Sequence, residues 1–178
     1  MEKKVKIKIA SRRYNVAGAL FDDFIEGERE DAFDLAALLG DESEEGDNSE
    51  TIEMVSEGTL RMADGRVELS YEETELTGME GSLTSISYDL RAPGLISMIR
   101  TGSVSTVLVF EERKRHLCVY NTPYMPFELC VKTHRVENTL LRDGRIYLDY
   151  LIEIKGASAE RSKFTIQVVS EEGTRLFS

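Results

Sequence analysis

The sequence predicts an all-β protein that folds as an antiparallel β-barrel of about eight to ten strands. Two observations predict this fold: apolar and polar residues alternate along most of the chain, and turn residues recur at short intervals between the alternating runs. The chain has 178 residues and is 41% hydrophobic, which is enough for one contiguous core. We therefore expect a single domain over residues 1–178.

The strands are expected in a consecutive series. The first covers residues 3–14, where Val5, Ile7 and Ile9 alternate with lysines. The others are expected at residues 52–62, 67–73, 82–90, 95–100, 104–111, 115–121, 127–136, 145–155 and 164–170. Asp64-Gly65 lies between the second and third strands and is typical of a tight hairpin, because glycine accepts a positive φ. Strands this numerous and consecutive favour a meander closed into a barrel, since closure removes exposed edges.

Most of the negative charge lies in one insertion. The chain has a net charge of −11, and residues 22–50 hold 13 acidic residues and one basic residue, Arg29. A short helix is expected there at residues 30–40, because acidic residues occupy its first turn and Gly40 stands where a C-cap would lie. This helix can cover a barrel mouth or dock on a protein partner. An acidic surface segment that keeps the protein soluble is the simpler interpretation.

Charge and hydropathy also exclude some classes of function. Outside residues 22–50 the acidic and basic residues nearly balance, so the basic stripe of a nucleic-acid-binding protein is missing. No apolar run of about 18 residues can cross a membrane, and lysines interrupt the apolar residues near Met1, so neither an export signal nor a membrane anchor is expected. Cys118 and Cys130 are too few for a disulfide framework. We expect a cytoplasmic protein whose two thiols stay reduced.

Two hairpin sequences resemble each other. Residues 64–71 and 143–150 share the pattern Asp-Gly-Arg-apolar-x-Leu-x-Tyr. A duplication would explain this likeness, but two hairpins that need the same turn would also look alike, and the second interpretation is preferred.

A longer series of residues resembles a known family. The stretch Gly65 to Gly81 is similar to the signature of the YwiB-like proteins, a family of unknown function with a calycin-type, lipocalin-like β-barrel. Further matches follow in chain order at Arg100-Thr101-Gly102, Phe110-Glu111, Tyr120-Asn121-Thr122-Pro123-Tyr124 and Asp149-Tyr150. The similarity covers most of residues 51–170 and the first strand. It implies a barrel related in shape to lipocalins and fatty-acid-binding proteins, and it implies no activity.

The chain departs from this family at two places. The family usually has glycine after Thr-Pro-Tyr, where this chain has Met125 followed by Pro126. If that glycine has a positive φ, Met125 would be strained, and the corner would bend differently. The acidic segment looks like an insertion between the first two family strands, so the resemblance gives it no role.

Strand parity indicates which side chains face the interior. Glu73 shares a face with the apolar residues of its strand, and Arg100 shares a face with Ile96 and Met98. The two charges can form an ion pair at the barrel mouth, or Arg100 can present its guanidinium to a ligand carboxylate or phosphate. The predicted polar contacts of a ligand are Tyr71, Glu73, Arg100, Tyr120 and Tyr124.

Catalytic and metal sites find little support. Glu72 and Glu73 are adjacent on a strand and point to opposite faces, so they cannot act as an acid-base pair. Cys130 and His134 would lie about 13 Å apart along a strand, too far to bind one metal, although pairing of neighbouring strands could bring Cys118 close to Cys130. No phosphate-binding loop, nucleophile elbow or nucleotide fingerprint is present, so we expect no cofactor and no metal.

Three functions from different classes remain. The preferred one is non-catalytic binding of a small, partly apolar ligand inside the barrel. The alternatives are an interaction module that uses the acidic insertion or an open barrel edge, and an enzyme of unknown reaction.

Overall fold

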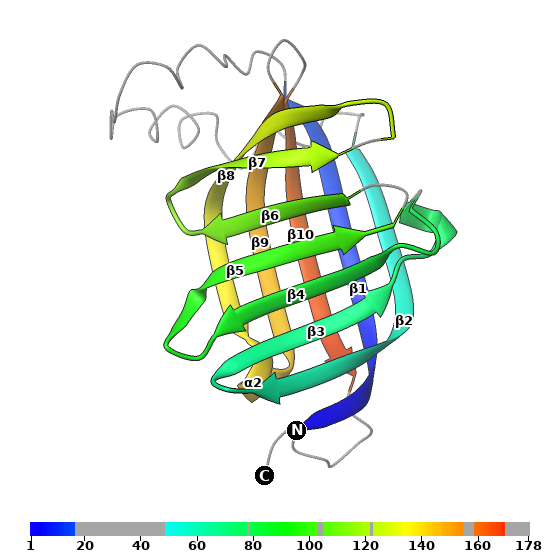
Figure 1. The fold of residues 1–178 in the computed structure, drawn as a ribbon, viewed down its shortest axis with the longest axis vertical. Helices are drawn as coiled ribbons and strands as arrows, with labels where there is room; N and C mark the ends of the chain where they lie inside the picture. The colour runs from blue at the N-terminus through cyan, green and yellow to red at the C-terminus, as the bar shows by residue number, and fades with distance from the viewer. Residues whose placement is uncertain (17–48, 78, 103–104, 122, 155–158, 170–178) are drawn as a thin grey trace.

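The computed structural model describes residues 1–16, 49–77, 79–102, 105–121, 123–154 and 159–169. They form ten β-strands and two short helices (Figure 1). The strands are β1 (Glu2–Val16), β2 (Ser49–Ala63), β3 (Arg66–Glu72), β4 (Leu83–Asp89), β5 (Ala92–Thr101), β6 (Ser105–Glu111), β7 (Arg115–Asn121), β8 (Pro126–Thr139), β9 (Arg145–Ile154) and β10 (Ala159–Val169). The helices are η2 (Glu75–Thr77) and α2 (Leu140–Asp143). The expected ten strands are confirmed.

The strands close into one barrel in which each strand pairs with its neighbours in the sequence. β1 completes the ring, because it pairs antiparallel with both β2 and β10. Ile7, for example, lies opposite Ser56 on one side and Val168 on the other. In Figure 1, β3 to β7 cross the face formed by β9, β10 and β1 at a steep angle. Among the described residues no strand is left with an open edge, so the expectation of a closed meander is confirmed.

Tight turns join the strands at the end of the barrel where Met1 lies. Asp64 and Gly65 both have positive φ, at 52° and 79°, as a type I′ hairpin requires. Gly144, with φ 73°, follows α2, which the sequence analysis did not predict. The helix expected at residues 30–40 lies outside the described residues.

The interior next to these turns is filled with apolar side chains. The largest fully buried residues include Phe110, Leu69, Ile86, Leu148 and Ile166. Leu140 of α2 is also buried and belongs to this core. Each comes from a different element and all belong to one buried cluster, so the inward faces of opposite walls pack against each other at this end. We call this region the packed end.

One pair of neighbouring strands is joined less extensively than the rest. Within the described residues, β6 and β7 are in register only at Ser105 with Asn121 and at Thr106 with Tyr120. Further along, the backbone of Val109 hydrogen-bonds the thiol of Cys118. The turn after β6 bonds to β8, because Arg113 donates its N–H to the carbonyl oxygen of Thr133 at 2.9 Å. The ladder between β6 and β7 is therefore short.

Two sequence-based questions about single residues have an answer in the structure. Met125 does not adopt a positive φ, because Asp64 and Arg113 are the described non-glycine residues with positive φ, so the corner bends without that strain. Cys118 and Cys130 do not face each other: their register partners are Leu129 and Leu117, which places the two thiols on opposite faces of the sheet. Both cysteines are free. No helix within the described ranges is long and apolar enough to cross a membrane.

Candidate functional site

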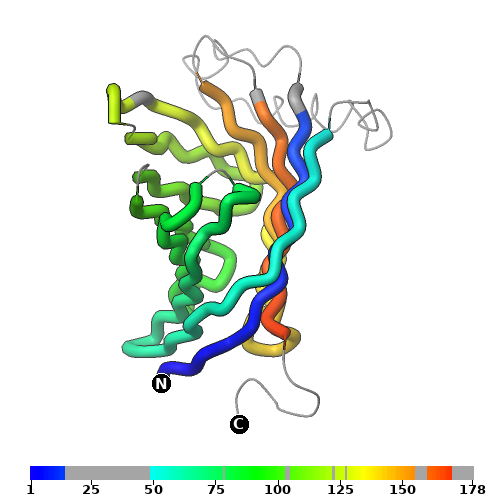
Figure 2. Tube along the Cα trace, turned by 90° about the vertical axis from the view of Figure 1, so that its right-hand side faces the viewer, coloured from blue at the N-terminus to red at the C-terminus, as the bar shows by residue number. Residues whose placement is uncertain are grey.

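A cavity of about 350 Å³ occupies the end of the barrel opposite the packed end. It lies where β1, β3, β5, β7 and β9 finish, between the two walls that Figure 2 shows from the side. We call this region the cavity end. Its apolar lining includes Ile9, Met54, Leu108, Ile152 and Phe164. Its polar lining includes Arg13, Tyr71, Glu73, Arg100, Tyr120 and Tyr150.

A row of polar residues crosses five neighbouring strands beside the cavity. Tyr71 of β3 lies opposite Thr84 of β4, and Thr84 lies opposite Arg100 of β5. The row continues through Thr106 of β6 to Tyr120 of β7. Tyr71, Thr84 and Thr106 are buried. Because these residues are in register, they reach the interior at the same level.

Glu73 contacts two members of this row, Thr84 and Arg100. Its Oε1 atom accepts a hydrogen bond of 2.5 Å from the hydroxyl of Thr84. The same oxygen lies 3.4 Å from Arg100 Nε, which makes an ion pair. The side chain of Glu73 is 1% exposed and that of Arg100 is 16% exposed, so the guanidinium is the more accessible charge of the pair.

Tyr71 extends this network as a neutral phenol. Burial, and next the negative charge of Glu73, raise the pKa of Tyr71 well above its ordinary value. Tyr71 is hydrogen-bonded to Thr84. Since the Thr84 hydroxyl donates its proton to Glu73, Tyr71 must be the donor to Thr84. The hydroxyl groups of Tyr71 and Thr84 thus form a donor chain that ends on the carboxylate.

A second row on the opposite wall repeats this arrangement. Tyr150 of β9 lies opposite Ser162 of β10, and Ser162 lies opposite Arg13 of β1. Burial raises the pKa of Tyr150, and its phenol is hydrogen-bonded to Ser162. Ser162 in turn donates to Glu160 at 3.5 Å, and Glu160 lies 3.9 Å from Arg13 Nε. Each wall thus carries a tyrosine, a hydroxyl, a carboxylate and an arginine.

The two polar rows help to explain why residues 64–71 and 143–150 are alike. Tyr71 and Tyr150 occupy the same position of the shared pattern, and both end beside the cavity. The common need for a turn explains the two glycines, which both have positive φ. The two turns also differ in conformation, since Asp64 has a positive φ whereas Asp143 ends a helix. A shared turn therefore does not explain the tyrosines, which lie further along the strands. The likeness therefore includes the cavity as well as the turn.

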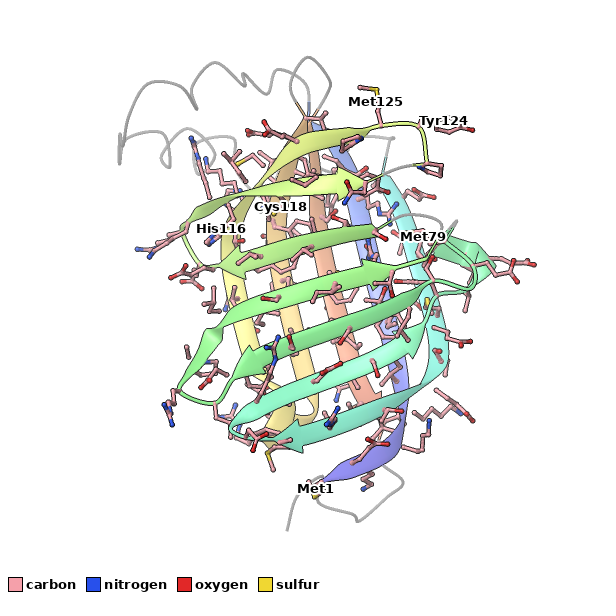
Figure 3. All side chains as sticks on the ribbon, in the orientation of Figure 1. Met1, Met79, His116, Cys118, Tyr124 and Met125 are labelled. Atoms are coloured by element: carbon pink, nitrogen blue, oxygen red, sulfur yellow. The ribbon has the colours of Figure 1, made fainter. Side chains whose placement is uncertain are left out.

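Four of the five predicted ligand contacts meet at the cavity, namely Tyr71, Glu73, Arg100 and Tyr120. Tyr124 does not line it. Its side chain is 95% exposed because it stands in the turn before β8, and Figure 3 shows Tyr124 and Met125 projecting beyond the barrel wall. The parity expectation for Glu73 and Arg100 holds, since both face inward and form the ion pair that was one of the two alternatives.

Sequence analysis missed the residues that link these groups: Arg13, Thr84, Tyr150, Glu160 and Ser162. The sequence alone does not show which residues lie opposite each other on neighbouring strands. Thr84 and Ser162 belong to the site because each lies opposite a cavity tyrosine. The similarity of residues 64–71 to residues 143–150 could have indicated Tyr150 once Tyr71 was chosen.

The cysteines and histidines do not build a second site of the expected kinds. Cys118 is buried in the core, and burial raises the pKa of its thiol. The pKa of Cys130 is raised to about 12 by burial and next by the charge of Glu153. Among the described residues no group of three or more His, Cys, Asp or Glu side chains is placed to hold a metal ion.

The fold and the cavity together define the class of this protein: a closed, ten-stranded antiparallel barrel of the calycin type, packed at one end and hollow at the other. A family model described as a domain of unknown function, DUF1934, matches residues 38–166. The chain belongs to this family, as its resemblance to the YwiB-like proteins implied.

A solved structure supports the same fold. The crystal structure of the YwiB protein from Bacillus subtilis superposes with a TM-score of 0.58 and covers 94% of each chain, at 16% sequence identity. At this identity the likeness extends to the fold alone. No curated protein gives a significant match.

Proposed function

We propose that this protein binds one small, partly apolar molecule in the cavity end of its barrel and does not transform it. The observation that carries the proposal is the convergence of Arg100, Tyr71 and Tyr150 on a cavity of about 350 Å³. This volume lies at the lower end of the range of roughly 300–1,000 Å³ found for small-molecule pockets.

The lining supports a ligand of mixed polarity. Ile9, Met54 and Phe164 offer an apolar wall, and the two polar rows supply hydrogen-bonding groups. Pockets for small molecules combine a mainly apolar lining with a few placed polar groups, because the first supplies affinity and the second fixes orientation. Within this proposal the protein acts in the cytoplasm, where the thiols of Cys118 and Cys130 would stay reduced.

The alternatives have less support. The barrel is closed within the described residues, so an interaction module could not use an open edge there. The other surface in that alternative, the acidic insertion, lies outside the described residues apart from Ser49 and Glu50. For an enzyme, Tyr71 and Tyr150 are poor bases, since burial raises their pKa values and keeps both phenols protonated at neutral pH.

The test compares ligand binding by the wild-type protein with binding by a variant whose cavity is filled by a larger side chain. Ser11 lines the cavity, so Ser11→Phe places a ring in it. The matched control is Val119→Phe, because Val119 lies on the outer face of β7 and is 50% exposed. We expect native mass spectrometry to find a small molecule bound to the wild-type and control proteins. We also expect titration with alcohols and acids of six to ten carbons to show binding to both.

Ser11→Phe should lose both signals while keeping a wild-type circular dichroism spectrum. The proposal is wrong if no bound mass is found and no probe binds, or if Ser11→Phe binds the probes as well as the control does.

A further inference from the structure

The guanidinium of Arg100 has unused hydrogen-bonding capacity inside the cavity. Its Nε atom is buried and has no hydrogen-bond partner, since the contact with Glu73 at 3.4 Å is an ion pair only. No hydrogen bond of its terminal nitrogens is found among the described residues either. An arginine side chain carries five N–H donors, and leaving buried donors unsatisfied is costly. Arg100 therefore has donors available for an acceptor that the described residues do not supply.

The position of Glu73 favours a negatively charged acceptor over a positively charged ligand. Glu73 is 1% exposed, and its Oε1 atom already accepts the hydrogen bond of Thr84. Arg100 is 16% exposed, and this exposure lies on atoms other than the buried Nε. A ligand that enters the cavity therefore meets the cation of the pair before it meets the carboxylate.

A second charge pair lines the cavity and adds no net charge to it. Arg13 is 30% exposed and lies 3.9 Å from Glu160, which is 41% exposed, so this is a loose pair near the surface. The charges of Arg100, Arg13 and Glu160 all act on the phenol of Tyr150, and all four residues line the cavity. Loose pairs at partly exposed sites are weak and can rearrange around a ligand.

The guanidinium and the apolar residues of the lining together indicate which class of anion would fit. A guanidinium binds a carboxylate through two parallel N–H···O bonds, and this planar arrangement needs little space. Beyond the polar row the lining includes apolar residues, among them Leu108 on β6, the strand next to Arg100, and Met54 on β2. A carboxylate followed by a hydrocarbon chain or ring satisfies both parts of this lining.

We propose that the ligand of this cavity is a small amphipathic carboxylic acid, whose carboxylate is bound by the guanidinium of Arg100 and whose apolar part lies against the wall that includes Leu108. This inference rests on the proposed binding function and adds the chemical class of the ligand.

Three probes with the same eight-carbon chain test the class directly: octanoate, octanol and octylamine, each titrated by calorimetry at pH 7. We expect octanoate to bind about tenfold or more tightly than octanol, because a hydrogen-bonded charge pair contributes that much in a shielded site. Octylamine should bind more weakly than octanol, because its ammonium group meets Arg100.

Two variants separate ligand binding from stability. Arg100→Gln alone would leave Glu73 buried without its cation, so the double change Glu73→Gln with Arg100→Gln is used. Glu73→Gln alone is the matched control, because it keeps Arg100 and removes the competing carboxylate. We expect Glu73→Gln to bind octanoate more tightly than the wild type, because Arg100 then has no carboxylate partner that competes with the ligand. The double variant should bind octanoate and octanol equally, with octanol affinity close to that of the wild type.

The outcomes distinguish this inference from the function on which it rests. If octanol binds as tightly as octanoate, and the double variant changes neither, the cavity binds apolar molecules and the carboxylate inference is wrong. If octylamine is the tightest probe, the anion preference is reversed and the inference is also wrong. If no probe binds, both the inference and the proposed function fail.

Discussion

The two ends of the barrel are made by the same strands, yet one is solid and the other is hollow. In β3 the inward residues change from Val67 and Leu69 to Tyr71 along the strand. In β9 the change is from Leu148 to Tyr150 at the corresponding position. Both strands run from the packed end to the cavity end. The difference shows that a barrel of fixed strand number acquires a cavity by changing the chemistry of its inward faces at one level.

The largest expected contrast lies within β9. Leu148 is fully buried at the packed end, so Leu148→Ala should lower the free energy of unfolding by ~2–5 kcal/mol, because it leaves a void in a filled core. Ile152 lines the cavity and is already partly exposed, so Ile152→Ala should lower the free energy of unfolding by clearly less than Leu148→Ala does. Urea denaturation measures both. Equal losses would show that the cavity wall is packed as tightly as the core.

The boundary between the two ends should resist added volume. Gly58 of β2 lies opposite Tyr71, and a Cβ atom there would lie 2.9 Å from the carbonyl oxygen of Ser70. Because backbone cannot move aside easily, Gly58→Ala should cost ~1–3 kcal/mol of the free energy of unfolding. Gly94 has open space at its Cβ position, so Gly94→Ala is the matched control and should leave the stability nearly unchanged. A tolerated Gly58→Ala would mean that β2 can shift there.

The polar row should contribute to stability as well as to binding. Thr84→Val removes the hydroxyl that joins Tyr71 to Glu73 and should lower the free energy of unfolding by about 1–3 kcal/mol, because two buried groups lose a partner. Thr84→Ser keeps the hydroxyl and should restore most of this loss. If Thr84→Val and Thr84→Ser are equally stable in thermal melts, the hydrogen bonds of this row do not stabilise the cavity end.

The smallest effect is expected from alkaline pH. The pKa of Tyr71 is raised in the folded protein, so the folded state keeps its proton above the ordinary tyrosine pKa of about 10, where the unfolded chain releases it. The contribution of this group to stability is therefore complete below about pH 10 and is lost as the pH rises further. We expect the melting temperature to fall less steeply above pH 10 in Tyr71→Phe than in the wild type. Identical slopes would contradict a protected phenol.

The sequence was sufficient for the strands and for their inward faces. Alternation identified the inward positions of Glu73 and Arg100, and the Asp64-Gly65 pair identified its hairpin, because both signals are local. The linking residues Thr84 and Ser162 could not be predicted in the same way. Each is a small polar residue in a strand, and its role depends on which residue lies opposite it, a property of register between strands. Tyr124 was misplaced because a turn residue has no parity to indicate its direction.

The short ladder between β6 and β7 lies directly beside the cavity, since Thr106 and Tyr120 form one of its two residue pairs. Most other neighbouring strands are held by longer runs of pairs, so spreading this wall breaks fewer hydrogen bonds than spreading any of those. This seam is therefore the part of the described wall that can separate with the fewest broken ladder bonds. The energy of separating it depends on those few bonds and on the turn whose Arg113 N–H is bonded to the Thr133 carbonyl oxygen.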